Sequence, residues 1–411
     1  MFATAGSSAG SGLQWPKRSN VPACAFWAAL VFPSFLLFAS SLAPAAESPK
    51  FQFYQIDKIG NQMGQTSLVD IDKDSKLDWV VGCSRGPVWW FRYEAPDRWT
   101  RYQIADRVGT EVGGVAFDVD GDGWIDQVSG NTWFRNPGSP AGKQWTRYEN
   151  GAIAGSHDNV AADIDGDGKL DVVMMSDKAG LFWYKIPKDP TQKWQAHQVG
   201  PGVHGGIAPR GVGDLDCDGD LDIVRSTGWF ENLDGKGTRW QWHENIPGGH
   251  SGRFKDTTKS WICDLNKDGR NDVVMCDCDS QLPNRRVHWF ENRDGKGRTW
   301  VRHEIAANVG DMHSLAVADF DGDGDLDVFS GEGPLGGTGL GGKRRWFIWE
   351  NVDGKGQVWK QHIILEGPEC HEAVAADVDG DGDIDICSKP WNGDLHVYLR
   401  NMLIESRSGA R

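Results

Sequence analysis

The sequence lacks the marks of several protein classes. No run of lysine and arginine forms a basic stripe, and 43 Lys and Arg are outnumbered by 58 Asp and Glu, for a formal net charge of −15. This balance argues against a nucleic-acid-binding protein. Beyond residue 42, no segment is long and apolar enough to cross a bilayer. We therefore expect no nucleic-acid partner, no membrane span in the mature chain, and a monomer.

The first 46 residues have the composition of a secretory signal peptide. Lys17 and Arg18 form a basic stretch, residues 23–42 are apolar, and residues 43–45 (Ala-Pro-Ala) resemble a cleavage site with small residues. We expect a protein that is secreted, periplasmic or extracellular. The apolar segment is long and contains Pro33, so an uncleaved N-terminal anchor is the alternative.

Cysteine is scarce in the remainder of the chain. Of 8 cysteines, Cys24 belongs to the N-terminal segment, and the odd number that follows leaves at least one free thiol in a secreted protein. Cys276 and Cys278 form a close pair, but zinc sites usually need more pairs than one. We expect scattered core thiols together with one or two disulfides.

One acidic pattern, Asp-x-Asp-x-Asp-Gly-x-x-Asp, recurs along the chain at intervals of 45 to 58 residues. Such a period is typical of an array of small supersecondary units. The copy that begins at Asp264 carries Asn266 at its second ligand position, and the worn copy that begins at Asp70 has Ser75 in place of the glycine. The seven copies begin at Asp70, Asp118, Asp163, Asp214, Asp264, Asp319 and Asp377.

Oxygen ligands at alternate positions suit a hard cation, and the glycine permits the sharp turn that gathers them. We predict up to seven Ca²⁺ ions, with the worn Asp70 loop the weakest; acidic turns without metal are the alternative. Seven such ions would nearly cancel the formal charge. The predicted ligands are Asp70, Asp72, Asp74 and Asp78; Asp118, Asp120, Asp122 and Asp126; Asp163, Asp165, Asp167 and Asp171; Asp214, Asp216, Asp218 and Asp222; Asp264, Asn266, Asp268 and Asp272; Asp319, Asp321, Asp323 and Asp327; Asp377, Asp379, Asp381 and Asp385.

Each acidic loop lies between two short apolar runs, which predict buried strands. An aromatic strand and a strand with Trp-x-x-Tyr or Trp-x-x-His follow, so one repeat holds four strands. Repeated four-stranded sheets predict an all-β, seven-bladed β-propeller. The last repeat stops at its third strand, residues 396–400, and residues 51–54 supply the missing fourth strand. We predict a ring of residues 47–401 closed by this N-terminal strand, followed by a frayed tail, 402–411.

The eleven histidines fall into two groups. His288 and His396 lie in third strands, and four more occupy a repeated fourth-strand position, so all six are expected to be structural: His197, His243, His303, His362, His288 and His396. The other five precede the first strand of a blade, which places them at the pore mouth on the face without calcium loops: His157, His204, His250, His313 and His371. Further polar candidates near that surface are Glu111, Asp158, Arg210, Lys255, Asp256, Asp311, Glu372 and Lys389.

Imidazoles from adjacent blades can share a Zn²⁺ or another transition metal, and a metal-free histidine can act as a general base near neutral pH. Lysine and arginine could neutralise a carboxylate or an enolate. This is the equipment for abstracting a proton next to a carbonyl and eliminating a group across the bond. The alternative is a ring of polar residues that solvates a water-filled pore. Tryptophans at fixed strand positions are expected to pack between blades, and the loop residue Trp391 is the candidate for stacking on a sugar.

With these motifs, residues 51–401 resemble the FG-GAP/VCBS-repeat propellers, a family that includes the integrin α-subunit head. The histidine-bearing arrangement is similar to the propeller domain of aldos-2-ulose dehydratases, and more loosely to propeller polysaccharide lyases. The resemblance implies His157, His313 and His371 as metal ligands or base, and Arg210 and Lys389 as anion stabilisers. From their place at the pore mouth, His204 and His250 are candidates for ligands of a second metal. The chain is too short for the additional cupin domains of the dehydratases.

Three functions from different classes follow from these observations. The first is a metal-assisted carbohydrate lyase or dehydratase. The second is a non-catalytic module that binds a glycan or a protein at the cell surface, and the third is a purely structural extracellular domain.

Overall fold

The computed structural model describes residues 49–110, 112–153, 155–176, 179–202, 204–247, 258–279 and 285–409. Residues 1–46, with the predicted signal peptide, lie outside these ranges, and so do Glu111, His250, Lys255 and Asp256. Within the described residues, no helix combines the length and the hydropathy that crossing a bilayer would require.

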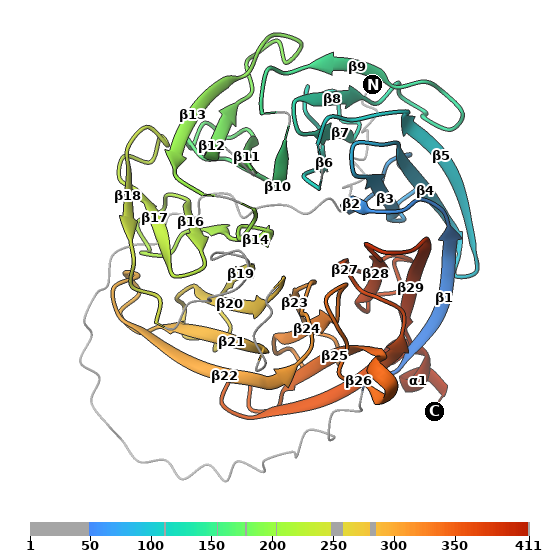
Figure 1. Ribbon diagram of the computed structural model, residues 1–411, viewed down its shortest axis with the longest axis vertical. Coiled ribbons are helices and arrows are strands. Elements are labelled where there is room, and N and C mark those ends of the chain that lie inside the picture. The colour runs from blue at the N-terminus through green and yellow to red at the C-terminus, as the bar shows by residue number, and fades with distance from the viewer. Residues whose placement is uncertain are drawn as a thin grey trace, which may run out of the picture. The chain divides into compact units, whose positions relative to one another are not determined.

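Seven antiparallel sheets form the blades of a ring, with the first strand of each blade toward the centre (Figure 1). The predicted all-β, seven-bladed propeller is thus confirmed. In blades one to three the chain runs from the inner to the outer strand: β2 (Met63–Val69), β3 (Asp78–Cys83), β4 (Val88–Ala95) and β5 (Arg98–Ala105); β6 (Val115–Phe117), β7 (Asp126–Ser129), β8 (Thr132–Arg135) and β9 (Thr146–Glu149); β10 (Ser156–Ala162), β11 (Asp171–Ser176), β12 (Gly180–Lys185) and β13 (Gln195–Gly200).

Blades four to six follow the same order, and a short strand, β14 (Pro209–Arg210), pairs in parallel with the innermost strand of blade five. Their strands are β15 (Val212–Gly213), β16 (Asp222–Arg225), β17 (Gly228–Asn232) and β18 (Trp240–His243); β19 (Thr258–Cys263), β20 (Asp272–Asp277), β21 (Arg285–Asn292) and β22 (Trp300–Val309); β23 (Ala316–Ala318), β24 (Asp327–Gly331), β25 (Arg344–Asn351) and β26 (Trp359–Gly367). A 3₁₀ turn, η1 (Leu340–Gly342), lies in the long loop before β25.

The seventh blade joins the two ends of the described chain. Its inner strands are β27 (Glu372–Ala376), β28 (Asp385–Lys389) and β29 (Leu395–Asn401), and its outer strand is β1 (Phe51–Lys58). β1 pairs antiparallel with β29, with Tyr54 opposite Tyr398. The two tyrosine rings stack at 5.9 Å. Because this pairing links residues from opposite ends of the sequence, it is a long-range contact on which the last blade depends.

Tryptophans on the third strands hold neighbouring blades together. The buried Trp183 and Trp229 donate from Nε1 to the carbonyls of Gly237 and Gly297 in the next blade, at 2.8 and 3.1 Å. Gly297 has φ +59°, and a Cβ there would meet the Trp229 ring at 2.4 Å, so only glycine fits this contact. The outer-strand His197 stacks on Trp183 at 4.2 Å. These contacts agree with the expected packing role of both residue types.

Two sequence expectations are wrong. The tail predicted to be frayed forms the helix α1 (Leu403–Gly409). Leu403 is buried, and Arg407 Nη2 donates to the Asp321 carbonyl at 2.9 Å. The expected one or two disulfides are absent from the described residues, where all seven cysteines are free thiols. Most lie in buried strands, where they pack as small apolar side chains.

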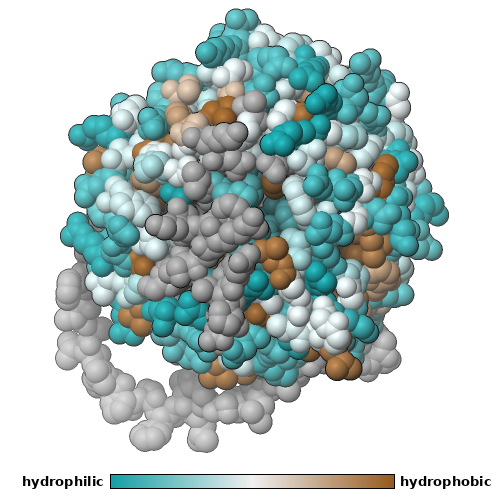
Figure 2. Space-filling model, viewed as in Figure 1, coloured by the Kyte–Doolittle hydropathy of each residue, from teal (hydrophilic) through white to brown (hydrophobic). Residues whose placement is uncertain are grey.

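Hydrophobic side chains on the face seen in Figure 2 are scattered among hydrophilic ones. The most exposed of the large hydrophobic residues described is Leu340, at 92%. Single exposed hydrophobic residues are ordinary on protein surfaces. Where Figure 2 shows described residues, hydrophobic side chains thus form no large patch that would direct the search for a functional site.

Candidate functional sites

The acidic loops are held in shape by their own carboxylates. In blade two, Asp118 accepts hydrogen bonds from the backbone N–H groups of Gly121 and Gly123, both at 2.8 Å. The ninth-position Asp126 accepts from Val119 at 3.2 Å and from Asn136 at 2.7 Å, which ties the loop to the third strand. Burial raises the pKa of Asp126 to about 8. A neighbouring cation would relieve the cost of ionising such a buried carboxyl.

The loops have the geometry for a divalent ion. Carboxylate oxygens from three positions of one loop lie within 4.8 Å of one another, for example those of Asp163, Asp165 and Asp171. In blade six, Asp321 is buried, and its Oδ2 accepts no hydrogen bond from the described residues. All-oxygen ligands at such separations fit Ca²⁺.

The loops divide into two electrostatic classes that the repeat pattern alone does not reveal. In blades one, two, three and seven, a basic side chain on the third strand bridges the loop carboxylates. Arg135, for example, pairs with Asp120 at 2.6 Å and with Asp122 at 3.0 Å. The equivalent residues are Arg92, Lys185 and Arg400.

Blades four, five and six carry glutamate at this position. Glu231, Glu291 and Glu350 bond instead to outer-strand histidines at 2.5 to 2.8 Å. Burial and the neighbouring Asp218 and Glu231 raise the pKa of Asp216 to about 6. Loops of this second class have no basic side chain on the third strand, although in blade five Arg270 of the loop itself pairs with Asp268.

A second cluster, which we call the channel cluster, gathers polar residues from the innermost strands, from the loops that precede them, and from the ends of the second strands β20 and β28. It comprises His157, Asp158, His204, Lys259, Cys278, Asp279, Asp311, His313, His371, Glu372 and Lys389. The His157 and His204 rings are tilted toward each other with centroids 4.2 Å apart, and the His313 and His371 rings stack at 4.0 Å. Asp279 connects the two pairs, because its Oδ2 lies 3.4 Å from His204 Nε2 and 3.3 Å from His313 Nε2.

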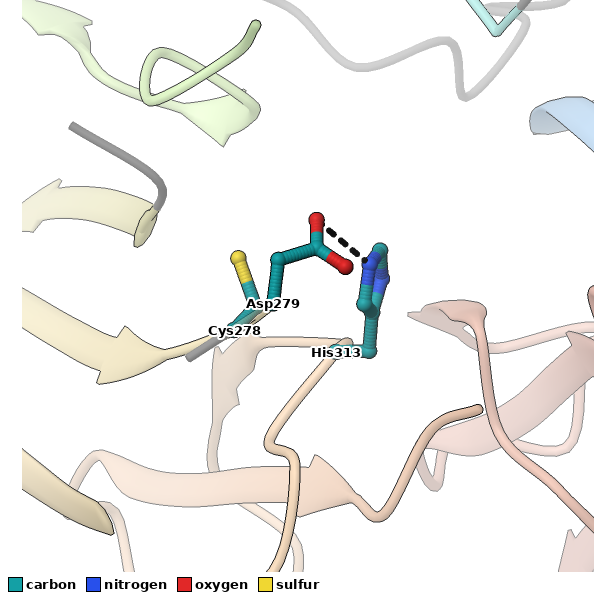
Figure 3. Close-up of side chains that lie close together, drawn as sticks. All are labelled: Cys278, Asp279 and His313. Atoms are coloured by element: carbon teal, nitrogen blue, oxygen red, sulfur yellow. Dashed lines mark hydrogen bonds and ion pairs between the residues drawn. The ribbon is translucent and has the colours of Figure 1, made fainter. Parts of the chain in front are cut away.

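His313 has a defined hydrogen-bonding direction. Its Nδ1 lies 2.8 Å from the carbonyl oxygen of His371. A carbonyl can only accept, so Nδ1 must carry a proton and Nε2 is the atom directed at Asp279 (Figure 3). The neighbouring Asp279 carboxylate raises the pKa of His313 against the effect of burial.

Lys389 and His371 form a buried basic pair. Lys389 Nζ lies 2.6 Å from His371 Nδ1 and also donates to the Met63 carbonyl. Burial lowers the pKa of Lys389 to about 8 and holds the pKa of His371 well below its usual range. A lysine with this pKa is partly unprotonated near neutral pH, which is a requirement for a general base.

Two further ion pairs flank this basic pair. Glu372 accepts from Lys259 Nζ at 2.9 Å and lies 3.5 Å from Lys389 Nζ. Asp158 bonds to His157 Nδ1 at 2.8 Å and accepts the backbone N–H groups of residues 207 and 208. The His157 hydrogen bond keeps the pKa of Asp158 low despite its burial. The channel cluster thus contains cations, anions and a neutral base within a few ångströms.

The structure brings four of the five predicted catalytic residues together: His157, His313, His371 and Lys389. Arg210 is exposed on β14, with its guanidinium 5.6 Å from the Trp261 ring centre. Sequence reasoning missed Lys259, Cys278 and Asp279. A signal existed for Lys259, which precedes its acidic loop by five residues, as Asp158 and Glu372 do. Cys278 and Asp279 follow β20 in a loop with no repeated register.

Two cavities among the described residues lie elsewhere, in and beside blade two. The larger, of about 520 Å³, is lined by residues that include Tyr102, Trp145 and Arg147. The smaller, of about 270 Å³, borders the Asp122 loop. Neither contains a group of the channel cluster, so we place the candidate site by its chemistry rather than by cavity size.

The fold and its repeated acidic loops define a seven-bladed propeller of the repeat type. The family model described as FG-GAP-like repeat matches residues 70–129, 118–174, 163–224 and 264–330. These matches cover more than half of the chain, and the protein belongs to the FG-GAP-like repeat family. Comparison with curated proteins gives no match.

Among solved structures, one chain of "Crystal structure of BBS1N in complex with ARL6DN, soaked with lead" is similar to this protein, with a TM-score of 0.50 and 9% sequence identity. The similarity covers 85% of this chain and 96% of that chain. At this identity the likeness concerns the fold alone.

Proposed function

We propose that this protein is a secreted, calcium-stabilised propeller that acts as a metal-assisted lyase or dehydratase on a carbohydrate. The observation that carries the proposal is the buried Lys389–His371 pair with its neighbouring charges. Unlike the acidic loops, this arrangement occurs once in the ring. Repeated features suit bracing of the fold, whereas a catalytic site is needed once.

Each group has a chemical role in such a reaction. His371 takes the proton from the carbon next to the substrate carbonyl and passes a proton from its Nδ1 to unprotonated Lys389. Lys259 supplies positive charge where the enolate develops. His157, oriented by Asp158, donates a proton to the departing oxygen. A Zn²⁺-type ion bound in the channel would polarise the carbonyl as a Lewis acid.

The product carries a new carbon–carbon double bond conjugated to a carbonyl, so ultraviolet absorbance follows the reaction. We would incubate the protein with keto-sugars and uronic-acid oligosaccharides and compare wild type with Lys389→Arg, which keeps the charge but cannot serve as a base near pH 7. Lys360→Arg is the matched control, because Lys360 pairs with Glu350 on an outer strand. We expect turnover in wild type and control only, and equal rates in Lys389→Arg would refute the role of Lys389.

A specific observation also favours a second candidate, a glycan-binding module. The Trp391 ring lies 4.9 Å from the His371 ring and is half-buried, and the Trp391 backbone is fixed by Glu369 at 2.6 Å. A fixed, partly open indole can stack on a sugar face. In this case calorimetry would detect glycan binding without turnover, Trp391→Ala would abolish the binding, and Trp242→Ala, on an outer strand, would not.

A further inference from the structure

Four side chains near one end of β20 offer sulfur, oxygen and nitrogen atoms that could ligate a metal ion. Cys278 and Asp279 follow β20, His313 precedes β23, and His204 precedes β14. The ligand atoms of Cys278, Asp279 and His313 all lie within 4.8 Å of one another. In Figure 3 the Cys278 sulfur and the Asp279 carboxylate extend to the same side of the chain, and His313 faces the carboxylate.

The distances from the two histidine Nε2 atoms to the Asp279 carboxylate are long for hydrogen bonds and match the spacing of atoms that ligate one metal ion. His313 Nε2 and His204 Nε2 lie 3.3 and 3.4 Å from the same oxygen, Asp279 Oδ2. Charge-assisted N–H···O contacts are usually about 2.7–2.9 Å. Two ligand atoms that each lie about 2.0–2.1 Å from a tetrahedral Zn²⁺ are separated by about 3.3 Å.

The hydrogen bonds of His313 are compatible with a metal ligand. His313 Nδ1 is committed to the His371 carbonyl, so Nε2 can face the Asp279 carboxylate only with a second proton or with a cation between them. A zinc-ligating histidine characteristically donates its other ring N–H to a backbone carbonyl or a carboxylate. The ligating carboxylate is also supported from behind, because the Asp279 N–H donates to Asp311 at 2.8 Å.

We propose that Cys278, Asp279, His204 and His313 form a tetrahedral site for a Zn²⁺-type metal ion. The expectation of a metal in the channel cluster rests on the proposed function. The new element is the set of ligands, of which Cys278 and Asp279 were not suggested by the sequence. The thiolate makes the site selective, since sulfur ligands favour zinc-class ions over the calcium that the all-oxygen loops would take. Metal binding ionises the Cys278 thiol outright.

Cobalt is the direct probe, because a thiolate–Co²⁺ bond gives a charge-transfer absorption and tetrahedral Co²⁺ gives intense visible bands. We would first add excess Ca²⁺ to occupy the carboxylate loops and then titrate the full chain with Co²⁺ as the only transition metal. Zn²⁺ would then be added to displace the cobalt. We expect one equivalent with the charge-transfer band. Cys278→Ser, nearly isosteric, removes the band and weakens zinc binding by about 100-fold or more, since losing even an outer partner costs about 10–100-fold.

His204→Ala tests the fourth ligand and should weaken the visible tetrahedral bands while the thiolate band remains. Cys217→Ser is the control. Cys217 is an exposed thiol in an acidic loop, so a cobalt band that disappears in this variant comes from adventitious binding there. Absence of cobalt binding, or a thiolate band unchanged in Cys278→Ser, would overturn the site. Circular dichroism of each variant establishes folding.

The outcome separates the two proposals. Stoichiometric zinc without turnover of any sugar would leave the metal site standing and remove the lyase. Turnover of a sugar by a protein that binds no cobalt would keep the lyase and remove this metal site.

Discussion

The two classes of acidic loop predict opposite effects of one substitution in the calcium-free protein. Asp216 and Asp120 hold the same position in blades four and two. Asp216 has no basic bridge and lies near Asp218 and Glu231, whereas Asp120 pairs with Arg135. We expect Asp216→Asn to stabilise the calcium-free fold and Asp120→Asn to destabilise it.

The magnitude follows from the pKa of Asp216, raised from 3.8 to about 6. One pKa unit is worth about 1.4 kcal/mol, so the ionised carboxylate would cost about 3 kcal/mol if it were unscreened. The side chain is partly exposed, and solvent screening reduces this to about 1 kcal/mol. The raised folded pKa means that stability is lost as pH rises from about 4 to about 6 and stays lost above. The gain in Asp216→Asn should therefore be present at pH 7 and absent at pH 4.

Loss of the exposed Arg135 pair in Asp120→Asn should cost about 0.5 kcal/mol. Denaturant titration in a chelator measures both variants against wild type. In saturating calcium both should be destabilised, by about 2–3 kcal/mol at an ion concentration 100 times Kd. Effects of the same sign in the chelator would refute the division of the loops into two classes.

Three further predictions concern the whole ring and the channel. Exhaustive chelation should lower Tm substantially because ions that bind only the folded state stabilise it by mass action; an unchanged melting curve would refute calcium binding. The kcat/KM for sugar elimination should rise with pH up to about 8, as buried Lys389 loses its proton, and a flat profile from about two pH units below this pKa to about one unit above it would exclude Lys389 as the base. In the chain from residue 47 onward, a thiol reagent followed by mass spectrometry should label the exposed Cys217 first and the five buried cysteines only after unfolding; rapid labelling of Cys276 would contradict the packing of blade five.

The sequence predicted those features that repeat. The period of the acidic pattern determined the number of blades, and the position six residues before each loop identified His157, His313 and His371. These positions are equivalent in every blade, so one structural rule applies to all of them. The offset five residues before each loop would have added Lys259 by the same rule.

Features that occur once could not be predicted in this way. Asp279 has φ +51° in a loop without an equivalent in other blades, and its place between His204 and His313 depends on three separate segments. The helix α1 forms because Leu403 is buried and Arg407 finds a carbonyl of blade six, contacts that composition does not encode. The prediction of disulfides was wrong because a thiol that is packed in a buried strand is stable without a bonded partner.

The inner strands keep the two kinds of site apart. His157 precedes Asp163 by six residues along β10 and its flanks, and an extended chain rises about 3.3 Å per residue, which gives about 20 Å. At this distance direct electrostatic coupling through water at physiological salt is largely screened, since the Debye length is about 8 Å. An ion in an acidic loop can therefore affect the channel cluster mainly by holding the inner strands in register. The loops can vary in charge from blade to blade, as the third-strand residues Arg135 and Glu231 show, while the channel cluster keeps one arrangement of ionisable side chains.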